Sequence, residues 1–288
     1  MTAAVWGALS SASLGAADFM GRFSGRAIGA TLTYGAVLLV GATITTLAVV
    51  LSGIEIVSSP YGWGMAILQG ISVSVMCILL YAGLARGPVA IVAPIVAAHP
   101  VFVLAINVAM GLRPGAAEWT AMAAILLGGI MIARSAGAHP QFAGETGAAE
   151  MRTTVLISLG ACFAYVAIVL SSQAAAPVLG ELQTVWISRC AGLVFVALIL
   201  LAQRTRISVP REWIPFLGLQ GLLDAIGYLT FLAGATSASP HIAMVVASTF
   251  SVFTVFLARV VLKEPISAQQ WIAIALITLG TGALAGHA

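Results

Sequence analysis

Charge is what this sequence has least of. Only 7% of its 288 residues are charged, and Lys263 is the single lysine. Ordinary soluble domains carry roughly 25% charged residues, whereas 61% of this chain is hydrophobic. One core cannot hide that much apolar surface, so we exclude a soluble domain and expect a lipid bilayer around the chain. The net charge of +3 comes from scattered basic residues, so no nucleic acid partner is expected.

Motifs of common enzymes and of metal sites are also missing. The chain contains no phosphate loop of the form G-x-x-x-x-G-K-[ST], no H-E-x-x-H and no G-x-S-x-G. Its three cysteines, Cys77, Cys162 and Cys190, lie inside apolar runs without the spacing of a metal site or a disulfide framework. We therefore expect no catalytic residue, no metal and no cofactor, and we predict that the protein is not an enzyme.

Long apolar runs are what the sequence does contain. A helix that crosses a bilayer needs about 20 mostly apolar residues. The sequence predicts an all-α integral membrane protein with ten such helices, at residues 2–20, 30–52, 62–84, 89–111, 116–134, 153–174, 182–202, 213–233, 241–262 and 267–286.

The chain is also an internal duplication. A shift of 151 positions places Leu68-Gln69-Gly70 on Leu219-Gln220-Gly221, and Pro114 on Pro265, without a gap. Because each copy has five helices, an odd number, two copies that fold alike must enter the membrane from opposite faces. We predict a first five-helix repeat at 1–136, a cytoplasmic linker at 137–151 and a second, inverted repeat at 152–288.

The distribution of basic residues predicts the orientation. Lys and Arg concentrate in cytoplasmic loops, and Arg113 is the only one in the loops after even-numbered runs. The loops after odd-numbered runs hold Arg22, Arg26, Arg86, Arg134, Arg152, Arg204, Arg206, Arg211 and Lys263. We expect both termini on the outer, periplasmic side of a bacterial inner membrane.

Two opposite charges fall at similar depth inside the predicted helices. Arg189 lies about 10 Å from one face and Asp224 about 17 Å from the other, at about 1.5 Å of rise per residue. Ionisable groups at such depth are costly and mark a pathway or a pair. We expect an ion pair near the midplane. It is either a contact that a zwitterionic substrate joins or a proton breaks, or a permanent lock that orders the second repeat.

Polar side chains form two stripes at helical spacing. One face of run 213–233 carries Gln220, Asp224 and Tyr228, and the corresponding face of run 62–84 carries Gln69, Ser72 and Met76. Such stripes line a wet cavity or hydrogen-bond across a bundle. We expect the cavity, because the 151-residue shift brings the two stripes into register.

Three aromatic rings complete the candidate site. His99 precedes Pro100 in mid-helix. It is either a gate, a proton carrier or a stacking ring for an aromatic substrate, or a neutral histidine satisfied by a nearby carbonyl. Tyr165 and Trp186 lie inside helices, as a pocket wall or as core filler. Asp18 lies four residues before Arg22, and we expect an i, i+4 pair there rather than the alternative, a coupling role.

Particular segments resemble the EamA-type members of the drug/metabolite transporter superfamily. They are Leu262-Lys263-Glu264-Pro265-Ile266-Ser267, Gln269-Gln270-Trp271, Gly280-Thr281-Gly282 and His99-Pro100-Val101-Phe102. The first half departs from this pattern, because Gly111-Leu112-Arg113-Pro114 lacks the glutamate. The second half has Ser251-Val252 where a proline is typical.

The resemblance implies a secondary transporter or facilitator with a central cavity, often an exporter of small metabolites. We expect export of small neutral or zwitterionic molecules, amino acids including aromatic ones, by alternating access and with a single copy functional. A non-transporting scaffold or receptor, and an exporter of drugs or other metabolites, are the alternatives. The sequence leaves open the substrate, the direction of transport and any coupling to protons.

Overall fold

The computed structural model describes residues 2–111, 113–136, 145–204, 208–235 and 239–287, which form helices and no strand. The first half contains α1 (Ala3–Ile28), α2 (Ala30–Ser52), α3 (Pro60–Arg86), α4 (Val89–Ala97), α5 (His99–Ala109) and α6 (Ala116–Ala136). The second half contains α7 (Glu145–Leu179), α8 (Glu181–Ala202), a short 3-10 helix (Arg211–Trp213), α9 (Ile214–Ala235), α10 (Pro240–Ala247), α11 (Phe250–Val261) and α12 (Ala268–His287).

Seven segments are long and apolar enough to cross a membrane. They are Ala30–Ser52, Pro60–Arg86, Val89–Ala109, Ala149–Leu179, Glu181–Ala202, Arg211–Gly234 and Ile242–Val261. Shorter apolar helices cover Ala116–Ile132 and Ala268–Leu284. Helix α1 is not among these segments, although it has 26 residues, and it carries Asp18, Arg22, Arg26 and several serines.

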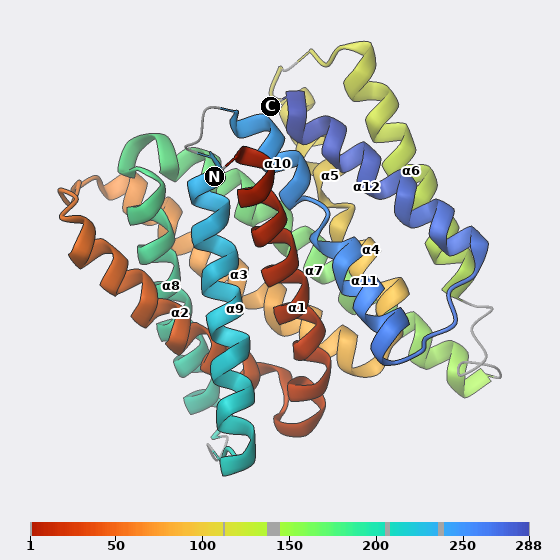
Figure 1. The fold of residues 1–288 in the computed structure, drawn as a ribbon, viewed down its shortest axis with the longest axis horizontal. Helices are drawn as coiled ribbons and strands as arrows, with labels where there is room; N and C mark the ends of the chain where they lie inside the picture. The colour runs from red at the N-terminus through yellow and green to blue at the C-terminus, as the bar shows by residue number, and fades with distance from the viewer. Residues whose placement is uncertain (1, 112, 137–144, 205–207, 236–238, 288) are drawn as a thin grey trace.

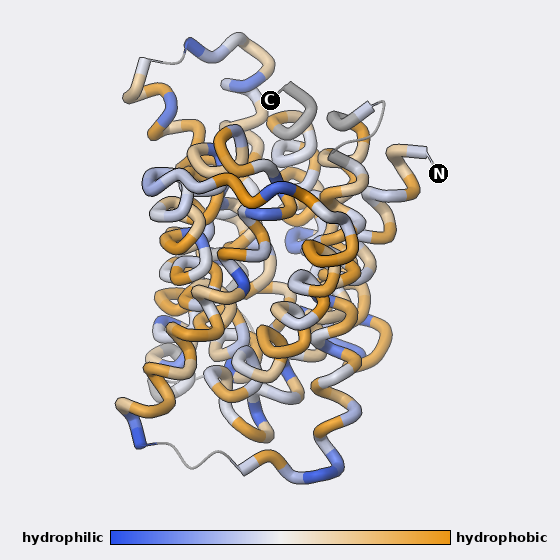
Figure 2. Tube along the Cα trace, turned by 90° about the vertical axis from the view of Figure 1, so that its left-hand side faces the viewer, coloured by the Kyte–Doolittle hydropathy of each residue, from blue (hydrophilic) through white to orange (hydrophobic). Residues whose placement is uncertain are grey.

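Large apolar side chains also cover the outside of the bundle. Leu51, Leu201 and Leu279 are 79%, 71% and 73% exposed, and hydrophobic segments run along the height of the helices (Figure 2). Soluble monomers rarely expose apolar surface on this scale. The exposed leucines therefore fit a surface that contacts lipid.

The predicted linker is partly helical. Residues 137–144 lie outside the described residues, while α7 begins at Glu145, eight residues before the predicted run. The segment that extends the helix contains Ala148, Ala149, Glu150 and Met151, which are good helix formers. The apolar pattern therefore marked the part of α7 suited to lipid and missed its polar first turns.

Two predicted helices are broken at equivalent positions. Helix α5 begins at His99 and α11 begins at Phe250, and these residues are related by the 151-residue shift. Pro100 explains the first break, because proline has no amide hydrogen to donate. The second break has no proline. Ser248 and Thr249 donate their hydroxyls to the Val245 and Val246 carbonyl oxygens at 2.7 Å, and such bonds compete with the helical pattern.

The main helix contacts come in matched pairs. Helix α1 packs on α9 as α7 packs on α3, and α2 packs on α9 as α8 packs on α3. Likewise, α1 contacts α10 and α11, as α7 contacts α4 and α5. Helices α6 and α12 pack on each other at one edge of the bundle (Figure 1). Each of these contacts joins the first half of the chain to the second.

Glycine allows the closest of these approaches. Gly70 on α3 lies against α8, where an added Cβ would overlap the Ser188 carbonyl oxygen and lie 3.0 Å from the Gly192 nitrogen. Gly128 on α6 also approaches α12, with its Cβ position 2.7 Å from the Ala273 carbonyl oxygen. Small residues let membrane helices gain packing contacts where water exclusion provides no force.

We predict that Gly70→Ala lowers the free energy of unfolding by about 1–3 kcal/mol, because the added methyl group must push two backbones apart. Gly64→Ala is the matched control on the same helix, since a Cβ at Gly64 meets nothing within 4 Å. Thermal unfolding in detergent measures both variants. Equal midpoints for the two variants would show that the α3–α8 contact tolerates a side chain.

Candidate functional site

A buried ion pair joins α8 to α9. Arg189 Nη1 lies 2.7 Å from Asp224 Oδ2, and the two side chains are only 3% and 10% exposed. Removing two charges from water is expensive, and their attraction offsets that cost only when the geometry is good. The ion pair predicted from the sequence is therefore confirmed as a contact.

The surroundings of the pair leave part of Arg189 without a partner. The Arg189 Cζ atom lies 4.2 Å from the ring centroid of Tyr228, which is a cation–π contact. On another side, the Cβ position of Gly41 on α2 is 3.5 Å from Nη1. The second terminal nitrogen, Nη2, has no hydrogen-bond partner among the described residues. A buried guanidinium with a spare donor can bind an anionic group such as a carboxylate.

Gln220 lies on the same stripe but has a structural contact. Its Nε2 donates to the Ala17 carbonyl oxygen at 3.2 Å, and its Oε1 accepts from Ser24 Oγ at 2.9 Å. The side chain is fully buried, and both bonds attach α9 to α1. The sequence left two interpretations of this stripe, a wet cavity or hydrogen bonding across the bundle. Gln220 forms hydrogen bonds across the bundle, whereas Asp224 and Tyr228 both contact Arg189.

The stripe on α3 is buried as well. Gln69 and Ser72 are 5% and 7% exposed, and Met76 lies one turn further along. The Gln69 Oε1 atom has no hydrogen-bond partner among the described residues. An unpaired buried carbonyl oxygen is costly, so Gln69 has an acceptor available to a ligand.

His99 and Tyr165 are brought together by the break between α4 and α5. Their ring centroids are 3.7 Å apart and the planes are inclined by 19°, so the rings are stacked. His99 Nδ1 lies 3.2 Å from the Val96 carbonyl oxygen. A carbonyl oxygen can only accept, so Nδ1 carries a proton, and in the neutral ring Nε2 is then an acceptor. The expected bond to a neighbouring carbonyl is present, alongside the stacking contact.

Trp186 occupies a different environment. Its Nε1 donates to Thr46 Oγ1 at 3.0 Å, and its ring lines a groove of about 410 Å³ between α3 and α8. The other lining residues are Trp63, Ile67, Ile71, Ile187, Cys190, Ala191, Val194, Phe195 and Leu198. The structure thus places Trp186 in an apolar groove rather than beside the ion pair.

Asp18 is the residue that the sequence analysis misassigned. The predicted pair with Arg22 is wrong, because Arg22 instead contacts Glu264 at 2.9 Å. Asp18 lies three residues from Gly21, which meets Tyr81 on α3, and three from Gly15, which meets Phe250 and Phe253 on α11. Asp18 is half-buried on α1 between these two contacts, within electrostatic range of Asp224. Among the described residues Asp18 has no ion pair.

The i, i+4 spacing misled because Arg22 has a partner 242 positions along the chain, which no local pattern shows. A signal did exist in the sequence. Asp18 and Asp224 are the only two aspartates of the chain, and both lie inside apolar runs.

Comparisons with known proteins agree with this architecture. Residues 152–285 match the model of the EamA-like transporter family, and no curated protein matches the chain. A solved structure titled "Crystal structure of protein" is similar in fold, with a TM-score of 0.68 and 16% sequence identity. The match covers 98% of this chain and 95% of that one. The chain is therefore a multi-pass membrane protein whose second half, residues 152–285, belongs to the EamA-like transporter family.

Proposed function

We propose that the whole chain is a secondary transporter or facilitator of the EamA type. It exports small neutral or zwitterionic metabolites, with amino acids, including aromatic ones, as the first substrate class. The observation that carries this proposal is the buried Arg189–Asp224 pair, which keeps a free guanidinium nitrogen inside a domain of a transporter family.

The proposed architecture is ten transmembrane helices in two inverted repeats, residues 1–136 and 152–288, with a cytoplasmic linker at 137–151. The matched helix contacts between the halves support a two-fold relation in the membrane plane. Helix α1 counts as a span, since it packs along α9 through a bond from Ser10 Oγ to the Gly227 carbonyl oxygen. The breaks at His99 and Phe250 support the same relation.

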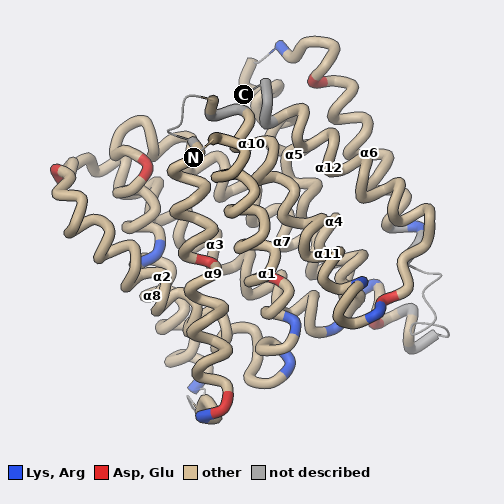
Figure 3. The backbone as a smooth tube through the Cα atoms, viewed as in Figure 1, with Lys and Arg blue, Asp and Glu red and all other residues tan. Residues whose placement is uncertain are grey.

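The charge distribution supports the proposed orientation. Lys and Arg gather toward one end of the bundle, while both termini lie toward the other end (Figure 3). Basic residues concentrate on the cytoplasmic side of membrane proteins. We therefore assign the Lys/Arg-rich end to the cytoplasm of a bacterial cell, across its inner membrane, and both termini to the periplasmic side.

In the proposed mechanism the substrate binds near the midplane and the site opens to each face in turn. Its carboxylate meets the free donor of Arg189, and its ammonium group meets Asp18 or Asp224. Gln69, Ser72 and Tyr228 orient it, while His99 and Tyr165 shape the walls or gate the pathway. Gln220 and Trp186 hold neighbouring helices in place around the site. A panel of labelled amino acids in proteoliposome counterflow, with and without a pH gradient, tests the function. A chain that only serves as a scaffold gives no counterflow.

We predict that Asp224→Asn abolishes counterflow and also destabilises the protein, because it leaves Arg189 buried without its counter-charge, at a cost of about 3–5 kcal/mol. The double variant Arg189→Gln/Asp224→Asn restores stability but not flux. Glu212→Gln, which neutralises an exposed acid before α9, serves as the control with normal flux. Recovery of flux in the double variant would make the pair a structural lock and end this assignment.

We predict that Asp18→Asn raises the KM for zwitterionic substrates while leaving the protein folded. A charged hydrogen bond contributes about 1.5–3 kcal/mol, which corresponds to roughly a tenfold to hundredfold change. For an analogue of the same substrate without the amino group, the KM is expected to rise less. Counterflow measured over a range of substrate concentrations gives the KM for the substrate and for the analogue. An equal rise in both KM values would show that Asp18 does not bind the amino group.

A further inference from the structure

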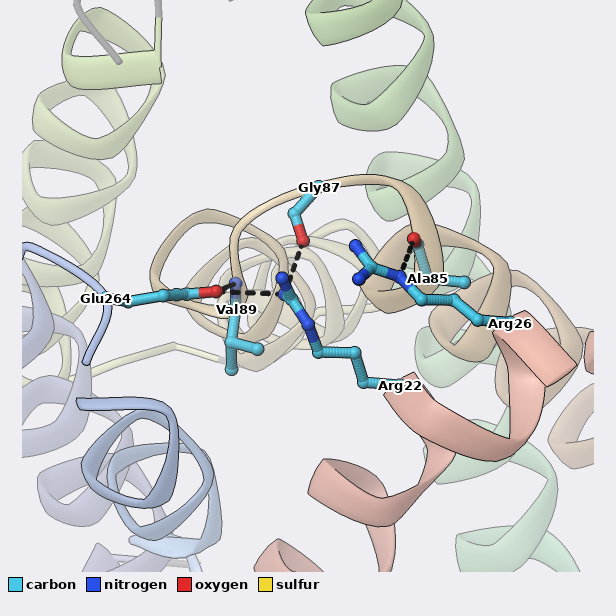
Figure 4. A network of polar contacts seen from close by, with 6 residues as sticks. All are labelled: Arg22, Arg26, Ala85, Gly87, Val89 and Glu264. Atoms are coloured by element: carbon cyan, nitrogen blue, oxygen red, sulfur yellow. Dashed lines mark hydrogen bonds and ion pairs between the residues drawn. The ribbon is translucent and has the colours of Figure 1, made fainter. Parts of the chain in front are cut away.

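A second buried ion pair closes the Lys/Arg-rich end of the bundle. Arg22 Nη1 lies 2.9 Å from Glu264 Oε1, and the side chains are 9% and 10% exposed. The same Arg22 nitrogen donates to the Gly87 carbonyl oxygen at 2.8 Å. Val89 N–H makes a longer bond of 3.5 Å to Glu264 Oε1. Figure 4 shows these groups converging from three separate segments.

The three segments are the end of α1, the connection between α3 and α4, and the connection between α11 and α12. Arg22 and Gly87 are 65 residues apart, and Val89 and Glu264 are 175 apart. The network thus joins both halves of the chain. Arg259 supports it from α11, since its Nη1 donates to the Glu264 carbonyl oxygen at 3.2 Å.

Neighbouring contacts close the same end. Gly21 and Gly25, in the last two turns of α1, lie against Tyr81 on α3. One turn after Arg22, Arg26 Nε donates to the Ala85 carbonyl oxygen at 2.5 Å. Helix α11 packs on α4. An opening of this end would separate α1 from α3 or α11 from α4. The Arg22–Gly87 bond joins α1 to the end of α3, and the bond from Val89 to Glu264 joins α4 to the connection after α11.

The pair is incompletely satisfied for a permanent structural contact. Arg22 Nε and Glu264 Oε2 are buried and have no hydrogen-bond partner among the described residues. Buried charges with unpaired atoms retain much of their desolvation cost, so the net stabilisation from such a pair is small. A weak net contribution suits a contact that breaks and re-forms.

We propose that Arg22, Gly87 and Glu264 form a latch that holds the Lys/Arg-rich end closed in this conformation and must release before that end can open. The latch belongs to one end of the molecule. In the other half, the positions related by the 151-residue shift hold Gln173 in place of Arg22 and Arg113 in place of Glu264. The same ion pair therefore cannot form between the equivalent positions of the other end, despite the duplication.

A thiol reporter next to the latch tests this proposal. Ala90 is 2% exposed and adjoins Val89 at the start of α4. Ala90→Cys is placed in a background in which Cys77, Cys162 and Cys190 are replaced by alanine. The labelling rate with a membrane-impermeant maleimide is measured in lipid nanodiscs. The reagent reaches both faces there, so the result depends on neither the membrane orientation nor a substrate, and it stands apart from the transport proposal.

Glu264→Gln is expected to raise the labelling rate of the Ala90→Cys reporter about tenfold. The charge exchange Arg22→Glu/Glu264→Arg is expected to bring the rate back toward that of the parent. Arg86→Gln is the matched control, because this exposed guanidinium at the same end hydrogen-bonds the Ala82 carbonyl oxygen of its own helix, at 3.4 Å, and forms no ion pair among the described residues. This variant is expected to leave the rate unchanged.

A second reporter separates opening from general loosening. Ala175→Cys lies in α7, in a fully buried cluster with Ala66, Leu179 and Ile187. The proposal requires that Glu264→Gln speeds labelling at Ala90→Cys and not at Ala175→Cys. An unchanged rate at the first reporter, or an equal rise at both, overturns the latch and leaves Glu264 with a static structural role.

Discussion

Polar groups inside a bilayer have no water to bind, and this constraint governs the structure. Each must find a partner within the protein or bear a cost of several kcal/mol. Backbone groups meet the constraint by forming helices, and hydroxyls meet it by bonding back to the preceding turn, as Thr45 does to the Gly41 carbonyl oxygen. Charged side chains meet it through two pairs, Arg189–Asp224 and Arg22–Glu264. The few atoms left unpaired then become the places where a ligand or a movement can act.

The two ion pairs lie in different parts of the molecule. Arg189–Asp224 lies between α8 and α9, beside Tyr228 and under the backbone of α2. Arg22–Glu264 lies where α1 meets two interhelical connections. Between them, Gln220 ties α9 to both Ala17 and Ser24 on α1. Helix α1 therefore connects the helix that carries Asp224 with the Lys/Arg-rich end, so a shift of α1 would affect both.

Close helix approach supplies the rigidity that these polar contacts need. Helices α3 and α8 meet at Gly70 and Gly192, and α2 approaches α9 at Gly221. Gly41 lets α2 pass over the ion pair without a side chain between them. The duplicated glycines keep a common backbone frame, within which the side chains of the two halves have diverged.

The sequence by itself determined the membrane class, the family resemblance and the buried Arg189–Asp224 pair. The signals for these conclusions are the lengths of the apolar runs, the turn that contains Glu264 and the charged residues inside apolar runs. All of them can be recognised from composition or from short segments of sequence. The sequence predicted one continuous helix at 89–111, although Pro100 is a local signal for the break at His99. It did not indicate the break before Phe250, because hydroxyl back-bonding by Ser248 and Thr249 leaves no sign as strong as a proline.

Only the tertiary structure decided the partners. Arg22 could contact Asp18 one turn away or any acid brought to it by packing, and it contacts Glu264. Gln220 and Asp224 share a helix face, yet one binds α1 and the other binds α8. Trp186, three residues before Arg189, lines an apolar groove instead of the polar centre. The physical reason is that sequence periodicity fixes the face on which a side chain lies, whereas helix crossing fixes what that face meets.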